Sequence, residues 1–125
     1  KVAVGRRGFT LIELMVVLAI IATLLTIAAP RYFAHLERAR ESALKETLFV
    51  VRDAIDKFHG DTGRFPETLD ELVTKRYLRK LPTDPLTDSG DSWTVLSPPG
   101  GGGGIYDLRS GAPGKAGDGT AYADW

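Results

Sequence analysis

The sequence predicts an α+β fold. A long N-terminal helix, membrane-spanning in its first half and amphipathic in its second, packs on a small domain with a short helix and a small antiparallel sheet. Three observations predict it. Residues 9–29 form an apolar run of 21 residues with one charged side chain, Glu13. Apolar residues then recur at helical spacing to about residue 59. The remaining residues, rich in proline and glycine, suffice for one small domain.

The composition excludes several classes of protein. The chain has no cysteine, so neither a disulfide framework nor a thiolate metal site can hold its fold. Residues 31–125 carry 13 Lys and Arg against 15 Asp and Glu. Nucleic-acid binding normally needs a surplus of cations to neutralise phosphates, so we expect no nucleic-acid partner.

The apolar run is long enough to cross a membrane. A helix rises about 1.5 Å per residue, so the run spans about 30 Å, the thickness of a bilayer hydrocarbon core. A cleaved secretory signal has an apolar run of only about 7 to 15 residues, so we expect no ordinary signal cleavage at its far end. Lys and Arg flank the run on both sides and do not decide its orientation. The basic start nevertheless favours a cytoplasmic N-terminus and an external domain.

Glu13 is the exception within this run. A carboxylate at the centre of a span costs roughly 2.5 to 3.5 kcal/mol, and less near the ends, so it usually has a partner or a function. Glu13 either lies at the level of the lipid headgroups, close to Gly8, or it pairs with a cation at the same depth. Pro30, at the end of the run, either ends the span or lies in a helix that continues.

Beyond Pro30, apolar residues recur with a period of 3.6 residues between charged ones, which is typical of an amphipathic helix. This apolar stripe comprises Leu36, Ala39, Ala43, Leu44, Leu48, Val51, Ile55 and Phe58. The helix is predicted over residues 31–59, with a break at the glycines of residues 60–63. His35 and His59 have no metal-ligand spacing, so we expect surface or helix-end histidines.

The small domain begins after this break. Residues 67–77 predict a short helix, and residues 93–97 and 105–110 predict two strands joined by a flexible glycine-rich loop. Residues 111–125 form a C-terminal loop. Neither glycine-rich stretch has the spacing of a phosphate-binding loop. The chain also offers no nucleophile with a base, so we predict no enzyme and no catalytic residues.

The stretch Gly8-Phe9-Thr10-Leu11-Ile12-Glu13, preceded by two arginines and followed by the apolar run, resembles the N-terminus of the type IV pilin and type II secretion pseudopilin superfamily. The resemblance implies that residues 1–8 are a leader, which a prepilin peptidase removes by cutting between Gly8 and Phe9. The peptidase would then methylate Phe9. A glycine at this position could also be a flexible joint. Access of a peptidase, which favours a residue without a side chain at the cleaved bond, explains Gly8 better.

Cleavage would create a cationic amine on Phe9, four residues before Glu13. Opposite charges attract far more strongly in a low-dielectric setting than in water, and leaving either charge unpaired is costly. The family implies that Glu13 of one subunit neutralises the Phe9 amine of its neighbour during filament assembly.

The resemblance extends to nearly the whole chain, which is most similar to the major (G-type) pseudopilin. It rests on the order of motifs and elements after the long helix: FP, short helix, LPxDP, strand, loop, YDLxS and terminal Trp. In that group a C-terminal loop binds calcium through carbonyls and aspartates. Matching by residue implies the carbonyls of Leu108 and Ser110 with Asp118 and Asp124. Calcium takes 6 to 8 oxygen ligands. The family's loop has an aspartate that this chain lacks, so these aspartates could instead be turn and surface residues.

The resemblance implies a structural subunit of the pseudopilus of a type II secretion system, which helps to export folded proteins. The chain would be a single-pass protein of the bacterial inner membrane, with residues 9–30 as its transmembrane and filament-core helix and residues 31–125 as its periplasmic domain. Its implied partners are other copies of itself, minor pseudopilins, the prepilin peptidase and an inner-membrane assembly platform. One alternative is a pilin-like subunit for adhesion, motility or DNA uptake, against which the lack of cysteine argues. Another is a static anchored binding module, which has no use for a peptidase site or for Glu13.

Overall fold

The computed structural model describes residues 8–125, so the predicted leader lies outside the described residues except for Gly8. The chain divides into two compact units, residues 1–37 and residues 38–125. Helix α1 covers Leu11–Thr62 and contributes to both. The predicted α+β fold class is confirmed by α1, a short second helix and a small antiparallel sheet.

In the first unit, α1 passes through Pro30 without ending. Proline removes one helix hydrogen bond and crowds the preceding turn, so it tends to kink or break a helix. The residues on both sides of Pro30 are nevertheless helical. Pro30 therefore lies within a helix that continues and does not end it.

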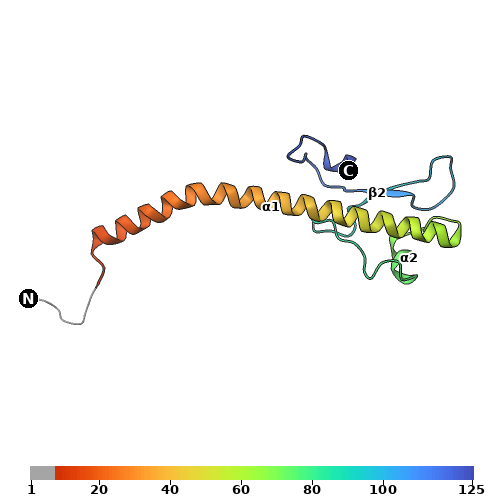
Figure 1. Cartoon of the computed structure of the whole chain (residues 1–125), viewed down its shortest axis with the longest axis horizontal. Helices are drawn as coiled ribbons and strands as arrows, with labels where there is room; N and C mark the ends of the chain where they lie inside the picture. The colour runs from red at the N-terminus through yellow and green to blue at the C-terminus, as the bar shows by residue number, and fades with distance from the viewer. Residues whose placement is uncertain (1–7) are drawn as a thin grey trace, which may run out of the picture. The chain divides into compact units, whose positions relative to one another are not determined.

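In the second unit, the apolar stripe of α1 forms one side of the hydrophobic core. Its buried residues are Leu44, Leu48, Val51, Ala54, Ile55 and Phe58. Leu72, Leu78, Trp93, Ile105 and Leu108 complete the core from the other elements. The predicted stripe is thus buried from Leu44 onward, whereas its earlier members Leu36, Ala39 and Ala43 are exposed. Figure 1 shows the second helix and the strands along the C-terminal half of α1.

The helix α1 ends later than the predicted residue 59. It continues through Gly60 to Thr62. Glycine inside a helix costs only about 1 kcal/mol relative to alanine, which neighbouring packing outweighs. The helix ends where Gly63 adopts a positive φ of 78° and donates its N–H to the carbonyl of His59, the usual glycine cap of a helix C-terminus.

Helix α2 covers Leu69–Thr74 and is shorter than the predicted range 67–77. Thr68 caps it, because its side chain accepts a hydrogen bond from the N–H of Glu71. The Glu71 carboxylate reaches back to the N–H of Glu67 at 2.9 Å and pairs with the guanidinium of Arg64 at 2.6 Å. Leu72 is the buried residue that attaches α2 to the core.

Strands β1 (Thr94–Leu96) and β2 (Asp107–Arg109) form a two-stranded antiparallel sheet in which Val95 pairs with Leu108. Both strands are shorter than the predicted ranges 93–97 and 105–110. The predicted C-terminal loop contains a short 3-10 helix, η1 (Tyr122–Asp124). Residues of β2 and η1 are in contact, so the end of the chain returns to the sheet.

Asp84 is fully buried although it carries a carboxylate. It accepts hydrogen bonds from the N–H of Leu86 at 2.9 Å and from the hydroxyl of Ser110 at 2.5 Å. It thereby joins the turn after the extended segment to the end of β2.

We expect Asp84→Ala to destabilise the second unit by about 2 to 3 kcal/mol, because it leaves one buried and one partly buried donor without their carboxylate acceptor. Urea unfolding of the fragment that begins at Arg31 measures this loss. Asp91→Ala, which removes an exposed carboxylate, is the matched control. Equal stability of the two variants would contradict the structural role of Asp84.

The Arg64 guanidinium and the N–H of Glu67 lower the pKa of Glu71 from 4.5 to about 2. A carboxyl group with a lowered pKa contributes stability above its unfolded pKa and loses it as the pH falls through the folded value. The difference in melting temperature between the wild type and Glu71→Gln should therefore be largest above pH 4.5 and vanish toward pH 2. Thermal unfolding across this range tests the expectation, and a difference that is independent of pH would refute it.

Candidate functional site

The predicted cleavage site lies just before α1, on residues without helical structure. Gly8, Phe9 and Thr10 precede the first helical residue, and all three are exposed. The Phe9 side chain is 81% exposed. A Cβ built on Gly8 would meet no atom within 4 Å. The described structure therefore sets no packing requirement for glycine here, and the peptide bond between Gly8 and Phe9 is open to a partner.

Glu13 takes part in the start of α1. The N–H of Glu13 donates to the hydroxyl of Thr10 at 3.1 Å, and the N–H of Thr10 donates to the Glu13 carboxylate at 3.4 Å. This reciprocal pair is a capping box, which satisfies two of the free donors at a helix N-terminus. Glu13 therefore has a local partner in the single chain, in addition to any partner in an assembly.

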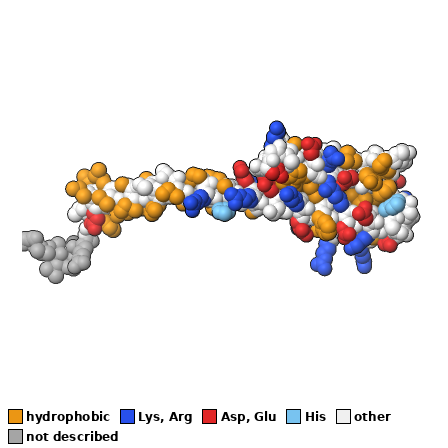
Figure 2. Space-filling model, turned by 45° about the horizontal axis from the view of Figure 1, so that its top comes forward, with side chains coloured by type: hydrophobic (Ala, Val, Ile, Leu, Met, Phe, Trp, Pro, Cys, Tyr) orange, Lys and Arg blue, Asp and Glu red, His pale blue; other side chains and the backbone are white. Residues whose placement is uncertain are grey.

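The first unit exposes almost every large apolar side chain that it carries. Those of the span are Phe9, Leu11, Ile12, Leu14, Met15, Val16, Val17, Leu18, Ile20, Ile21, Leu24, Leu25 and Ile27. Figure 2 shows hydrophobic side chains gathered along this part of α1, and charged side chains spread over the second unit. By length and composition, α1 is able to cross a membrane. Such a surface needs lipid or an apolar partner around it.

The polar groups of this segment are satisfied within the helix. The hydroxyl of Thr23 donates to the carbonyl of Ala19 at 2.8 Å, and that of Thr26 donates to the carbonyl of Thr23 at 2.6 Å. Hydroxyl groups that bond back to their own helix need no water. The threonines are thus compatible with an apolar environment.

The residues of the four predicted calcium ligands lie in different surroundings. Ser110, whose carbonyl is the predicted ligand, is fully buried with its hydroxyl bound to Asp84, and Asp124 is exposed in η1. The Asp118 carboxylate accepts from the hydroxyl and the N–H of Thr120 at 2.6 and 3.0 Å, which lowers the pKa of Asp118. Within residues 8–125, no group of three or more His, Cys, Asp or Glu is arranged to hold a metal ion.

The carbonyl of Leu108 is hydrogen-bonded to Arg52. One nitrogen of the guanidinium donates to this carbonyl at 3.0 Å and also to the main-chain oxygen of Trp125, while another donates to the Asp107 carboxylate at 2.7 Å. Arginine is positively charged at every accessible pH. A calcium ion at the Leu108 carbonyl would lie beside this charge, so the donor set here does not fit a divalent cation.

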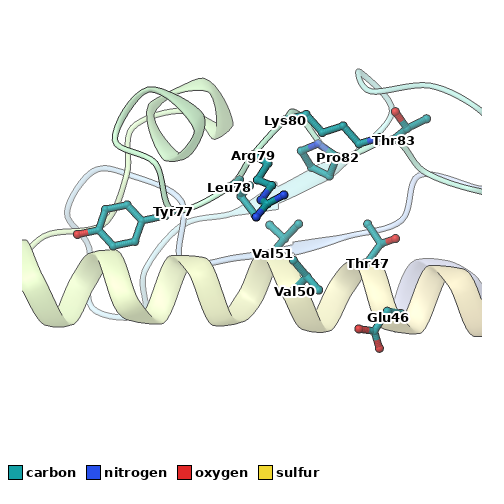
Figure 3. Close-up of a pocket in the computed structure, with 10 residues that line it drawn as sticks. All are labelled: Glu46, Thr47, Val50, Val51, Tyr77, Leu78, Arg79, Lys80, Pro82 and Thr83. Atoms are coloured by element: carbon teal, nitrogen blue, oxygen red, sulfur yellow. The ribbon is translucent and has the colours of Figure 1, made fainter.

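A groove of about 520 Å³ lies between α1 and the segment after α2 (Figure 3). Val50, Val51 and Leu78 supply apolar surface, and Arg79 and Lys80 supply charge. The residues that line it include no serine, cysteine or histidine that could act as a nucleophile with a base.

The two histidines are accounted for without a metal. His59 stacks on Phe65 with ring centroids 4.1 Å apart, and His35 is exposed on α1. Neither belongs to a metal-binding group among the residues that the structure describes. Both positions agree with the expected surface or helix-end histidines.

Sequence reasoning missed two features of this site. Thr10 was not identified, although the spacing of Thr10 and Glu13 is that of a capping box and could have revealed it. In the sequence, Arg52 is only one of the charged residues between the apolar positions of the helix. No local signal shows its partners, since they follow it by more than 50 residues in the chain.

Comparisons with known proteins match both parts of the chain. Residues 5–29 match the family model described as a prokaryotic N-terminal methylation motif. The chain is 34% identical to type II secretion system core protein G of Pseudomonas aeruginosa, covering 95% of this chain and 92% of the relative. It is 31% identical to the protein of the same name from Aeromonas hydrophila, over 96% and 92% of the two chains. No solved structure matches the chain.

Proposed function

We propose that this chain, which belongs to the family of type II secretion system core protein G, is processed by a prepilin peptidase and then polymerises into a pseudopilus that helps to export folded proteins. Members of this family are major pseudopilins, which are structural subunits and not enzymes. The observation that carries the proposal is the N-terminal site. An exposed, non-helical Gly8–Phe9 bond directly precedes a capped helix whose apolar surface has no partner among residues 8–125.

Processing is the first step of the proposal. A peptidase must bind an extended strand of substrate, and a bond inside a helix is not available in that form. The Gly8–Phe9 bond lies outside the helix, and a Cβ added at Gly8 would meet no described atom within 4 Å beyond its chain neighbours. Cleavage there makes Phe9 the first residue and gives it an amine, which the peptidase methylates.

Assembly is the second step. Before assembly the apolar half of α1 anchors the chain in the inner membrane, with the second unit in the periplasm. Afterwards the same surface packs against other copies, because a repeated contact that does not close produces an open helical filament. Minor pseudopilins and an assembly platform in the inner membrane are the further partners of this step.

Glu13 connects the two steps. Its hydrogen bond to the N–H of Thr10 is long, at 3.4 Å, and a carboxylate has about four acceptor positions. The carboxylate therefore keeps most of its capacity for a second partner. The Phe9 amine of a neighbouring subunit is a cation at a matching depth, and it would remove the cost of an unpaired charge in an apolar core.

Processing is tested by intact-mass spectrometry of the protein purified from membranes of a host that has the peptidase. We expect a mature chain that begins at Phe9 and carries one added methyl group. Gly8→Ala should retain its leader, because the added Cβ meets the peptidase and not the chain itself. A leader that remains on the wild type in the presence of active peptidase would contradict this function.

Assembly is tested by two substitutions of Glu13. Glu13→Gln keeps a capping box, since glutamine serves in place of glutamate, but removes the charge. Glu13→Ala removes both. We expect both variants to be processed and neither to form filaments, because the neutral side chains cannot balance the Phe9 amine. Filament yield after shearing measures assembly. Normal assembly of Glu13→Gln with failure of Glu13→Ala would assign Glu13 to helix capping alone.

A further inference from the structure

The end of the chain is attached to α1 by three charged side chains of that helix. Glu41, Lys45 and Arg52 are at positions i, i+4 and i+11, a spacing that places them along one side of a helix. Each contacts the segment that follows β1. Together they are called the α1 clasp below.

Glu41 and Lys45 contact the last residues of the chain. One oxygen of Glu41 accepts from the hydroxyl of Tyr122 at 2.8 Å and from the N–H of Gly117 at 3.2 Å. The amine of Lys45 lies 4.7 Å from the centroid of the Trp125 ring, within the range of a cation–π interaction. The rings of Tyr122 and Trp125 pack edge to face at 5.2 Å.

Arg52 makes the densest set of contacts in the clasp. Its guanidinium donates to the Asp107 carboxylate, to the Leu108 carbonyl and to the main-chain oxygen of Trp125. The side chain is 37% exposed and that of Asp107 is 26% exposed, so both are partly withdrawn from water. Charge-assisted hydrogen bonds of a planar guanidinium are among the stronger ones in proteins.

The three acceptors form an oxygen cage, with one carboxylate and two main-chain oxygens from β2 and the end of the chain. Oxygen donors of this kind are the ligands that a hard divalent cation prefers. The cage already contains a permanent positive charge, and a divalent ion at the same oxygens would be repelled by it. Asp118, which the resemblance implied as a further ligand, is bound to Thr120.

We propose that Arg52 is the cation of this cage, and that the α1 clasp holds the C-terminal segment of this chain without calcium. The resemblance to the major pseudopilins implied a calcium ion for this task. Here a side chain of α1 holds the segment, so the segment folds against the helix at any concentration of divalent ions. The inference concerns the folding of the second unit and does not depend on cleavage or on filament formation.

The first test is the melting temperature of the full chain in detergent, with a chelator and with added calcium chloride. We expect the wild type to melt at the same temperature in both. Arg52→Ala should melt about 5 °C lower or more, because it removes the guanidinium donors from a partly buried carboxylate and from two main-chain oxygens. The matched control is Lys57→Ala, which removes a cation of the same helix whose ion pair with Asp53 is exposed. Its shift should be under about 2 °C.

The second test reads the C-terminal segment directly. Trypsin cleavage after exposed Lys115 releases a peptide that begins at Ala116, which mass spectrometry identifies. We expect Arg52→Ala to raise the rate of this cleavage about tenfold, and Lys57→Ala to leave it unchanged. Arg52→Lys keeps a charge but loses the planar fork, so it should give an intermediate rate. This variant also keeps the test decisive if Arg52→Ala fails to fold.

Two results would overturn the proposal. One is a wild type that melts several degrees higher with calcium than with chelator, which would show that a divalent ion holds the segment. The other is cleavage after Lys115 at equal rates in the wild type, Arg52→Lys and Lys57→Ala, which would show that the guanidinium does not hold it.

Discussion

The second unit depends on burial of one face of α1. Helix α2 and strands β1 and β2 are each too short to be stable alone, because isolated helices below about 12 residues and isolated two-stranded sheets are marginal in water. They are held by side chains such as Leu72 and Leu108, which are fully buried against that face. Phe58 is fully buried there too. The long helix is therefore the scaffold on which every shorter element is positioned.

The same helix meets a different constraint in the first unit. Its side chains there have no core to enter, so they must be matched by lipid or by other subunits. Backbone and hydroxyl groups are satisfied inside the helix, as at Thr23 and Thr26. Glu13 is the departure from this rule. Its local bond to Thr10 fixes the start of the helix and leaves most of the carboxylate unused, so capping and charge pairing are compatible roles of one side chain.

Periodicity predicted what depends on local pattern. The stripe from Leu44 to Phe58 and the existence of both strands follow from the spacing of apolar residues, which can be read from one sequence. The ends of the helices and strands were less predictable. Packing extends α1 past Gly60, and the strands include only the residues that pair across the sheet. Contacts such as Arg52 with Asp107 were not predictable. A charged residue on the polar face of a helix has the same sequence pattern whether it is solvated or bound to a distant segment.

The distribution of charge explains why that distant contact forms. Residues 81–125 carry six aspartates and only two Lys or Arg, and α1 places two cations, Lys45 and Arg52, against this segment. A segment with this excess of negative charge buries only a few apolar residues of its own, and a cation on a neighbouring element stabilises its docking. An ion from solution can supply this cation, but the stability it contributes depends on the concentration of the ion. A guanidinium on the scaffold helix is always present, because it is covalently attached at the position where the segment must dock. In this chain the acidic C-terminal segment meets Lys45 and Arg52 of α1, and the α1 clasp is where these opposite charges pair.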